Sequence, residues 1–147
     1  MFVLLPQNQI VSTMKYFLLI VIATIFFSSC DSTSEKTKAL TLKGIKAYQL
    51  NDEETATIFF NKAMRVDPNN YEALYYLALI DFNKKSYEGA IEKLHKVIEI
   101  NAKYGEAYRN LGKIYFVIGD RKNSCVYYKL AQEHGVKNLS NHLKGCS

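Results

Sequence analysis

The stretch AIEKLHKV, residues 90–97, has counterparts at a fixed interval on both sides. ATIFFNKA (56–63) lies 34 residues before it, and SCVYYKLA (124–131) lies 34 residues after it. Each copy starts with a small residue, carries a large residue four positions later and ends on a smaller apolar residue three positions after that. These spacings place the three side chains on one face of a helix. A period of this length indicates stacked repeats of one supersecondary unit.

A further helix is predicted before each of these segments. Small residues follow large ones by four positions at Leu40 and Gly44, Leu74 and Ala78, and Tyr108 and Gly112. A small side chain lets the partner helix approach closely, and a large one fills the adjacent gap. Turn residues such as Asn51-Asp52 and Gly119-Asp120 separate the segments. The predicted helices span residues 37–50, 53–66, 71–84, 87–100, 105–118 and 121–134.

A shorter helix is expected at the end of the chain. Leu139, Leu143 and Cys146 have the spacing of one helix face between about residues 138 and 146. Such a helix would cover the apolar side that the last hairpin leaves open. The predicted fold class is all-α. It is a short α-solenoid of three antiparallel helix-turn-helix repeats, at 37–70, 71–104 and 105–138, with a C-terminal capping helix at 138–147.

The repeats resemble the tetratricopeptide repeat (TPR). The small and large positions described above match the TPR signature in three copies, over about 100 residues. Some positions depart from that signature: Lys43 replaces a leucine, Ala47 and Asp81 stand at a position where only Tyr115 is aromatic, and Pro68 alone matches the closing proline. The resemblance implies a protein-interaction scaffold in which the first helices of successive hairpins line a concave groove.

The groove positions of the TPR family, carried over to this sequence, fall on residues of all three repeats. They are Tyr48, Tyr75, Leu79, Phe82, Asn83, Arg109, Lys113 and Phe116. The resemblance therefore implies a groove that is apolar in the middle and basic at its far end, suited to a peptide with an apolar core and an acidic residue. Chaperone-binding members hold a C-terminal carboxylate with Lys and Asn, where this chain has Thr41 and Ile45. That function is therefore not expected. The alternative is a shallow surface, in which the aromatic residues pack between neighbouring helices.

The N-terminal region reads as an export signal. Residues 17–27 (FLLIVIATIFF) carry no charge, follow Lys15 and precede Ser28-Ser29-Cys30. This run is shorter than the ~20 residues of a transmembrane helix. Its end resembles the lipobox of bacterial lipoproteins, with Phe27 in place of the usual leucine. The resemblance implies a signal peptide over 1–29 and lipidation of Cys30. The alternative is an uncleaved signal anchor.

Two further expectations concern the same region. Met14 stands directly before Lys15, and a start at Met14 would give the signal an ordinary length. The alternative is a longer n-region that begins at Met1. After Cys30 the chain is polar, and residues 30–36 are expected to form the lipidated cysteine and a flexible tether. The protein is thus expected in the bacterial cell envelope, anchored to a membrane and exposed outside the cytoplasm.

Composition and motifs argue against catalysis and nucleic-acid binding. The net charge is +5, and the basic residues alternate with acidic ones along the chain and form no polybasic block. The sequence has no GxSxG motif and no glycine-rich phosphate loop, so neither an enzyme activity nor a cofactor or small-molecule substrate is expected. His134, His142 and Cys146 make at most a weak candidate metal site. The alternative is that the histidines lie on the surface, and no metal is expected.

The remaining cysteines are predicted to pair. If Cys30 carries lipid, Cys125 and Cys146 remain, and export places them in an oxidising compartment. Cys125 falls in the last repeat, and Cys146 falls in the cap that should pack against it. A disulfide between them would contribute about 3 kcal/mol in the chain-entropy model. The alternative is two buried thiols.

Two functions remain open from the sequence. The first is a membrane-anchored lipoprotein that binds another protein or a peptide through the TPR groove, for example in envelope assembly. The second is a structural lipoprotein that tethers envelope layers through its convex face.

Overall fold

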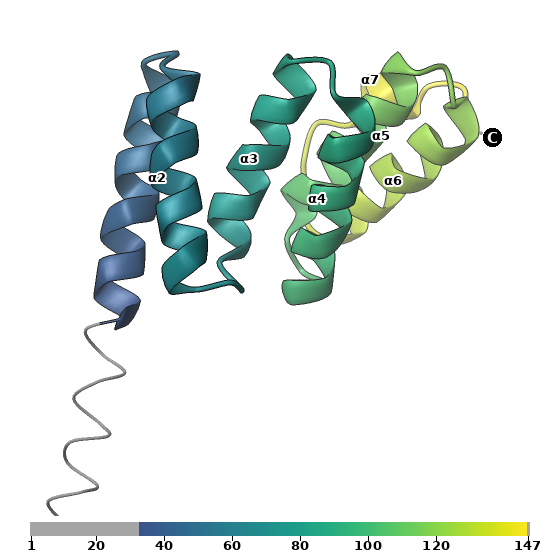
Figure 1. Ribbon diagram of the computed structural model, residues 1–147. Helices are drawn as coiled ribbons and strands as arrows, with labels where there is room; N and C mark the ends of the chain where they lie inside the picture. The colour runs from purple at the N-terminus through teal and green to yellow at the C-terminus, as the bar shows by residue number, and fades with distance from the viewer. Residues whose placement is uncertain (1–32, 147) are drawn as a thin grey trace, which may run out of the picture. The chain divides into compact units, whose positions relative to one another are not determined.

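The computed structural model describes residues 33–146, so the expected signal peptide and Cys30 lie outside the described residues. Within this part every regular element is a helix, which confirms the all-α prediction (Figure 1). The first helix covers residues 33–49. The others are α2 (Glu53–Val66), α3 (Tyr71–Asn83), α4 (Tyr87–Ile100), α5 (Gly105–Val117), α6 (Arg121–Glu133) and α7 (Ser140–Leu143).

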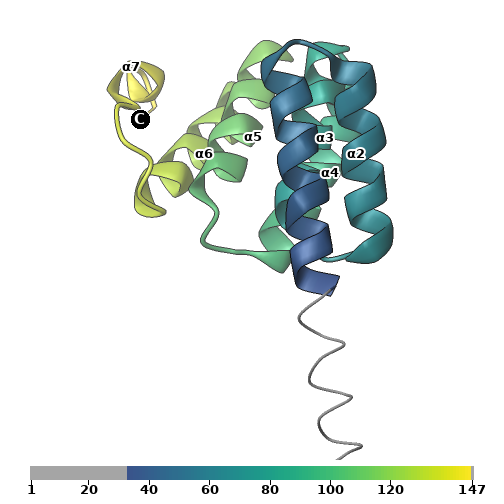
Figure 2. The same ribbon diagram turned by 90° about the vertical axis from the view of Figure 1, so that its left-hand side faces the viewer.

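Helices that follow one another in the sequence also lie side by side. The contacts are most extensive between α3 and α4 and between α5 and α6, the two helices of the second and third hairpins. Fewer contacts join α2 to α3 and α4 to α5, which link one hairpin to the next. Figures 1 and 2 show the resulting row of helices, with α7 beyond α5 and α6 at one end. The predicted solenoid of hairpins is therefore present.

The sequence period reflects close packing within each hairpin. A Cβ atom added to Gly44 would lie 2.5 Å from the Phe60 ring, and one added to Gly112 would lie 3.0 Å from the Tyr128 ring. Phe60 and Tyr128 are among the largest fully buried side chains, together with Leu94. The small residue is therefore needed because the large residue of the partner helix occupies the space where a side chain would be.

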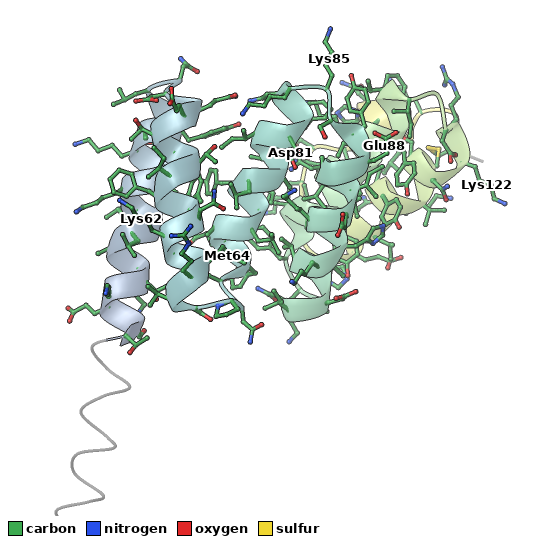
Figure 3. All side chains as sticks on the ribbon, viewed as in Figure 1. Lys62, Met64, Asp81, Lys85, Glu88 and Lys122 are labelled. Carbon is green, nitrogen blue, oxygen red and sulfur yellow. A yellow bond between two sulfur atoms is a disulfide. The ribbon has the colours of Figure 1, made fainter. Side chains whose placement is uncertain are left out.

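One pair of equivalent positions is filled differently in two repeats. In the third repeat Tyr115 stacks on Tyr127, with ring centroids 5.3 Å apart. The same positions in the second repeat hold Asp81 and Lys93, whose charged atoms are 2.6 Å apart. Figure 3 shows Asp81 between α3 and α4. An ion pair between two helices thus replaces an aromatic stack, which explains the departure of Asp81 from the TPR signature.

The turn inside each hairpin uses the left-handed backbone region at one repeated position. Asn51, Lys85 and Gly119 have φ angles of 60°, 61° and 88°. This conformation ends the preceding helix, because L-residues cannot continue a right-handed helix through it. The first helix, α3 and α5 accordingly end one residue before the predicted boundary. Asp52 and Asp120 then cap α2 and α6, each accepting a backbone N–H three residues on at 3.0 Å.

The structure corrects two expected segments. Residues 33–36, assigned to a flexible tether, are helical and continue the first helix. Glu35 and Lys36 favour helix, which offsets their lack of apolar character. The capping helix, expected over about 138–146, is confined to Ser140–Leu143.

The short cap has a backbone cause. Asn138 has φ 63° and Gly145 has φ 86°, so left-handed residues flank α7 on both sides. Leu139 then serves as the cap residue of α7 and is only 4% exposed. It packs with Tyr108, Tyr128 and Ala131. The segment therefore covers the last hairpin mainly through one buried leucine and not through a long helix.

Candidate functional site

The eight predicted groove residues come from the first helix, α3 and α5, and they differ in exposure. Tyr75 is buried, whereas Tyr48, Leu79 and Phe82 are half-buried. Asn83, Arg109, Lys113 and Phe116 are exposed. The basic residues and Phe116 all lie on α5, so the exposed part of this surface is concentrated toward the C-terminal repeat.

Tyr75 is a packing residue between α3 and α5. Only 7% of its surface is exposed, and Asn110 on α5 donates a hydrogen bond from Nδ2 to its hydroxyl at 3.0 Å. Burial disfavours the charged phenolate and raises the pKa of Tyr75 to about 12. Its ring also meets Tyr104 edge-on at 5.0 Å. For this residue the structure shows the packing role that the sequence left open.

A chain of aromatic rings crosses from the first helix to the start of α5. Tyr48 contacts Tyr76 edge-on at 5.4 Å, and Tyr76 contacts Tyr75 at the same distance. Tyr75 meets Tyr104, which in turn contacts Tyr71 at 5.2 Å. Burial raises the pKa values of Tyr76 and Tyr104. Tyr71, Tyr76 and Tyr104 were not among the predicted groove residues, although the high tyrosine content (11 residues) was a signal.

Cations cover the aromatic residues at the other side of the surface. Lys113 Nζ lies 4.7 Å from the ring centroid of Phe82, so a residue of α5 reaches over α3. The Arg121 guanidinium lies 5.7 Å from the ring of Phe116, which is still 55% exposed. Asn83 turns away to α2 and donates to Glu53 Oε1 at 2.7 Å. Lys113 and Phe116 remain exposed despite these contacts, whereas the Asn83 amide is hydrogen-bonded within the fold.

A pocket of about 290 Å³ lies beside this surface. Arg109, Asn110 and Lys113 of α5, Tyr128 of α6 and His142 of α7 line it. The His142 ring stacks on Tyr128 with centroids 4.6 Å apart. Arg109 forms an ion pair with Glu106 one turn earlier, at 2.6 Å. Arg109 and Lys113 were predicted groove residues, whereas Tyr128 and His142 were not, because the wall formed by the cap depends on tertiary structure.

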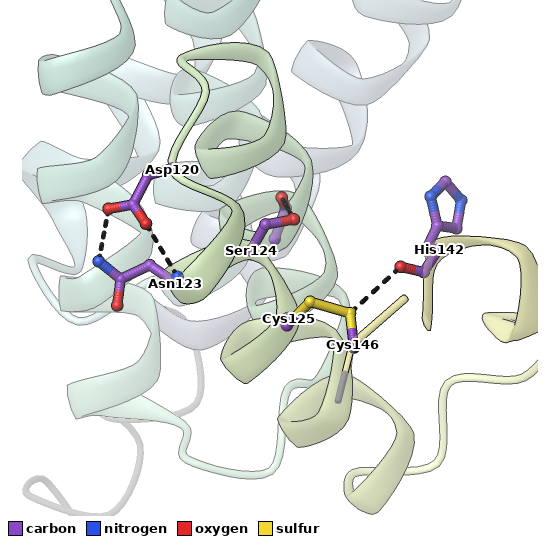
Figure 4. Close-up of a disulfide and its surroundings, with 7 residues drawn as sticks. Asp120, Asn123, Ser124, Cys125, His142 and Cys146 are labelled. Atoms are coloured by element: carbon purple, nitrogen blue, oxygen red, sulfur yellow. Dashed lines mark hydrogen bonds between the residues drawn. A yellow bond between two sulfur atoms is a disulfide. The ribbon is translucent and has the colours of Figure 1, made fainter. Parts of the chain in front are cut away.

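Cys125 of α6 and Cys146 beyond α7 form a disulfide, with Cα atoms 5.5 Å apart. Figure 4 shows the bond beside the backbone of His142, whose carbonyl lies 3.6 Å from the Cys146 sulfur. Next to Cys125, Ser124 Oγ donates to the Gly112 carbonyl at 2.9 Å and ties α6 to α5. The bond therefore joins the pocket-bearing hairpin to the segment that supplies His142.

The three residues of the weak candidate metal site, His134, His142 and Cys146, each contact another side chain of the fold. His134 stacks on Tyr108 with centroids 4.7 Å apart, and His142 stacks on Tyr128. Cys146 is bonded to Cys125. Among residues 33–146 no group of His, Cys, Asp and Glu side chains is arranged to hold a metal ion. No helix of that same part is long and apolar enough to cross a membrane.

Comparison with known proteins supports the repeat assignment. Residues 78–119 match the family model described as TPR repeat. The UDP-N-acetylglucosamine–peptide N-acetylglucosaminyltransferase of Caenorhabditis elegans is 31% identical over 85 residues, which are 58% of this chain and 7% of that protein. The mouse BBSome complex member BBS4 is 28% identical over 91 residues, 62% of this chain and 17% of that protein. The chain thus spans less than a fifth of these relatives.

Solved structures share the fold over most of the chain. The first TPR domain of Spaghetti (RPAP3), bound to the HSP90 peptide SRMEEVD, has a TM-score of 0.69 at 24% identity. The match covers 76% of this chain and 90% of that one. The Arabidopsis OM64 TPR domain has a TM-score of 0.70 at 18% identity, over 77% of this chain and 95% of that one. TPR domains generally mediate protein–protein interaction, and most are not themselves catalytic. This chain therefore has the fold of a TPR solenoid, and its residues 78–119 are similar to a TPR repeat.

Proposed function

We propose that this protein is a membrane-anchored lipoprotein that binds a peptide segment of another protein along the first helix, α3 and α5. The observation that carries the proposal is the exposed apolar and basic surface of α5. Phe116 is 55% exposed although it is a large aromatic residue, and Lys113 lies next to it along the same helix. Aromatic residues, phenylalanine included, are enriched in the buried centres of protein interfaces.

The similar fold supports a peptide as the partner. The RPAP3 domain is a TPR domain bound to a peptide, and it shares its fold with this chain. The peptide chemistry is expected to differ. Thr41, which stands where chaperone-binding members have lysine, is buried and accepts a hydrogen bond from Asn70 Nδ2 at 2.8 Å. Thr41 is therefore engaged within the fold, and Ile45 offers no hydrogen bond to a terminal carboxylate.

The interaction surface is tested by site-specific photocrosslinking in the native membrane. A photoreactive phenylalanine analogue at Phe116 is expected to crosslink a partner. The matched control is the same analogue at Val126, which is 46% exposed on α6. Crosslinking at Phe116 that is lost in Lys113→Glu supports the groove. Crosslinking at Val126 alone would refute it and favour the tethering function through the second helices.

The anchor is proposed from the lipobox-like sequence before Cys30. Two acyl chains hold a protein firmly at a membrane, whereas one chain is marginal. Metabolic labelling with a fatty acid is expected to mark the wild type and not Cys30→Ala. Cys125→Ala is the control, because a cysteine that forms a disulfide within the fold should not be the acylated residue. Label that persists in Cys30→Ala would refute the anchor but leave the interaction surface untouched.

A further inference from the structure

The first helix carries an exposed face whose composition differs from that of α3 and α5. Residues 36–50 contain four lysines and no acidic residue, whereas α3 has two acidic residues and no cation, and α5 contains both kinds of charge. Leu42, Lys46 and Leu50 recur every four residues, so they lie on one side of the helix. Leu42 is 67% exposed and Leu50 is 71% exposed, the highest values among the large apolar side chains of residues 33–146. Two exposed leucines thus alternate with lysine on one side of the first helix.

This face occupies the positions with which a later first helix packs on the preceding hairpin. Leu77 and Ile80 of α3 are buried and pack in one cluster with Phe60 of α2. The residues one period earlier are Lys43 and Lys46, and both are exposed. The first helix therefore presents cations where α3 presents buried aliphatic side chains.

α2 adds a further cation beside the first helix. The ammonium groups of Lys43 and Lys62 lie 5.8 and 5.5 Å from the centroid of the Phe59 ring, so the two helices bring their lysines to the same aromatic residue. Figure 3 shows Lys62 on the side of the first hairpin that faces away from α3. None of the ion pairs formed within the described chain involves these two lysines or Lys46. We call this surface the N-terminal face; its residues are Lys38, Leu42, Lys43, Lys46, Leu50 and Lys62.

We propose that the N-terminal face docks on the anionic headgroup surface of the membrane in which Cys30 is anchored. Apolar side chains flanked by lysines are the pattern of a helix that lies in a membrane interface, where the apolar groups enter the headgroup region and the lysines meet anionic lipids. Cys30 stands seven residues before Thr37, and a chain of that length reaches at most about 25 Å, so an anchored chain keeps this face near the membrane. This inference rests on the proposed anchor and adds an orientation to it.

The distribution of charge favours a membrane over a second copy of the chain. Two N-terminal faces in contact would bring four lysines against four others, and like charges repel. The acidic residues at positions 52–54 stand at the turn of the hairpin, where Asp52 caps α2 and Glu53 accepts a hydrogen bond from Asn83. The lysines therefore remain free to meet lipid phosphates. Contact through this face leaves Phe116 of α5 exposed to a peptide partner.

The test uses residues 31–147, which keep all three core clusters complete and lack Cys30, so the result does not depend on acylation. The chain has no tryptophan, and Leu42→Trp therefore gives a single fluorescent reporter on the face. Its emission is expected to shift to shorter wavelength with vesicles of phosphatidylglycerol and phosphatidylcholine in equal parts, and not with phosphatidylcholine alone. The matched reporter is Val126→Trp on α6, an exposed position whose emission should not change.

Charge removal tests whether these particular lysines drive binding. Lys43→Gln/Lys46→Gln should weaken partitioning into the mixed vesicles at least about tenfold, because each lysine near an anionic surface contributes about fivefold. The matched control is Lys122→Gln/Lys129→Gln, which removes the same charge from exposed positions of α6. That pair should change partitioning less than about twofold, because charges farther from the membrane than a Debye length are screened.

Four outcomes would overturn the membrane contact. The first is no emission shift and no partitioning at millimolar lipid, whereas the anchor and the groove are tested separately by labelling at Cys30 and crosslinking at Phe116. The second is an equal loss in the two glutamine pairs, because net charge and not this face would then drive binding. The third is a shift at Val126→Trp alone, which would place the contact on α6. The fourth is binding to polyglutamate without binding to vesicles, which would assign the face to an acidic protein.

Discussion

Removing the Cys125–Cys146 disulfide should destabilise the protein to a predictable extent. The two cysteines are 21 residues apart in the sequence. In the chain-entropy model a loop of this length restricts the unfolded chain by about 3 kcal/mol. For a domain of this size that free energy corresponds to a loss of about 10–15 °C in melting temperature. The perturbation is the double variant Cys125→Ser/Cys146→Ser, which leaves no free thiol in the fold.

The structure also predicts which part of the protein loses stability first when the disulfide is removed. The backbone N–H groups of His142 and Leu143 both donate to the Leu139 carbonyl, so they report on the cap alone. Leu77 on α3 lies in a different part of the core and reports on global unfolding. In the serine variant the cap amides should exchange faster than in the wild type, by a larger factor than Leu77.

Thermal unfolding and hydrogen exchange, both without reductant, check this prediction. Thiol titration of the denatured wild type provides the control and should find no free thiol at Cys125 or Cys146. Two free thiols would show that the bond does not form in the protein. A melting temperature within about 2 °C of the wild type, less than 1 kcal/mol by the same conversion, would show that a formed bond contributes little and that Leu139 holds the cap.

Three further variants test the packing, the turns and the buried tyrosine. Gly44→Ala should lower the free energy of unfolding by about 1–3 kcal/mol, because its Cβ would lie 2.5 Å from Phe60. A higher free energy of unfolding, measured by urea denaturation, would contradict this. Lys85→Gly should raise the melting temperature, corresponding to about 0.5–1 kcal/mol, because it relieves a φ of 61°; a decrease would show that the lysine side chain matters. The raised pKa of Tyr75, about 12, favours the protonated folded state. Stability is thus complete below about pH 10 and falls as the pH rises toward 12, and Tyr75→Phe should make that fall shallower in alkaline denaturation; an unchanged slope would contradict the shift.

The hairpins could be predicted because their cause is local and repeated. Each copy of the 34-residue period carries its small and large residues at the spacing that one helix face requires. A structure built from contacts between neighbours in sequence leaves few alternative arrangements. The ends of the helices followed from turn residues, except at Lys85. A lysine is rare in the left-handed region, so Lys85 could not be recognised as the turn residue from its type.

The pocket and the aromatic chain could not be predicted in the same way. Arg109 and Lys113 were visible on one helix face, but His142 reaches them only because the backbone reverses at Asn138 and Leu139 becomes buried. Tyr104 precedes α5, outside the periodic pattern, so helical spacing gave no information about it. The ion pair of Asp81 with Lys93 could have been predicted by aligning the repeats, because the equivalent residues of the third repeat are both tyrosines and so form a matching pair.

The cap also determines what can pack against the last described hairpin. α7 contacts α6 as α3 contacts α2 and α5 contacts α4, so it occupies the place where the first helix of a fourth hairpin would pack. Leu139 covers the apolar surface that an added repeat, or the open end of a second molecule, would need. Because Cys146 is bonded to Cys125 of α6, another helix that competes for this surface cannot release the cap while the disulfide is intact. Within residues 33–146 the exposed side of the last hairpin is therefore already covered, so another molecule could pack end-to-end against it only if the cap moved.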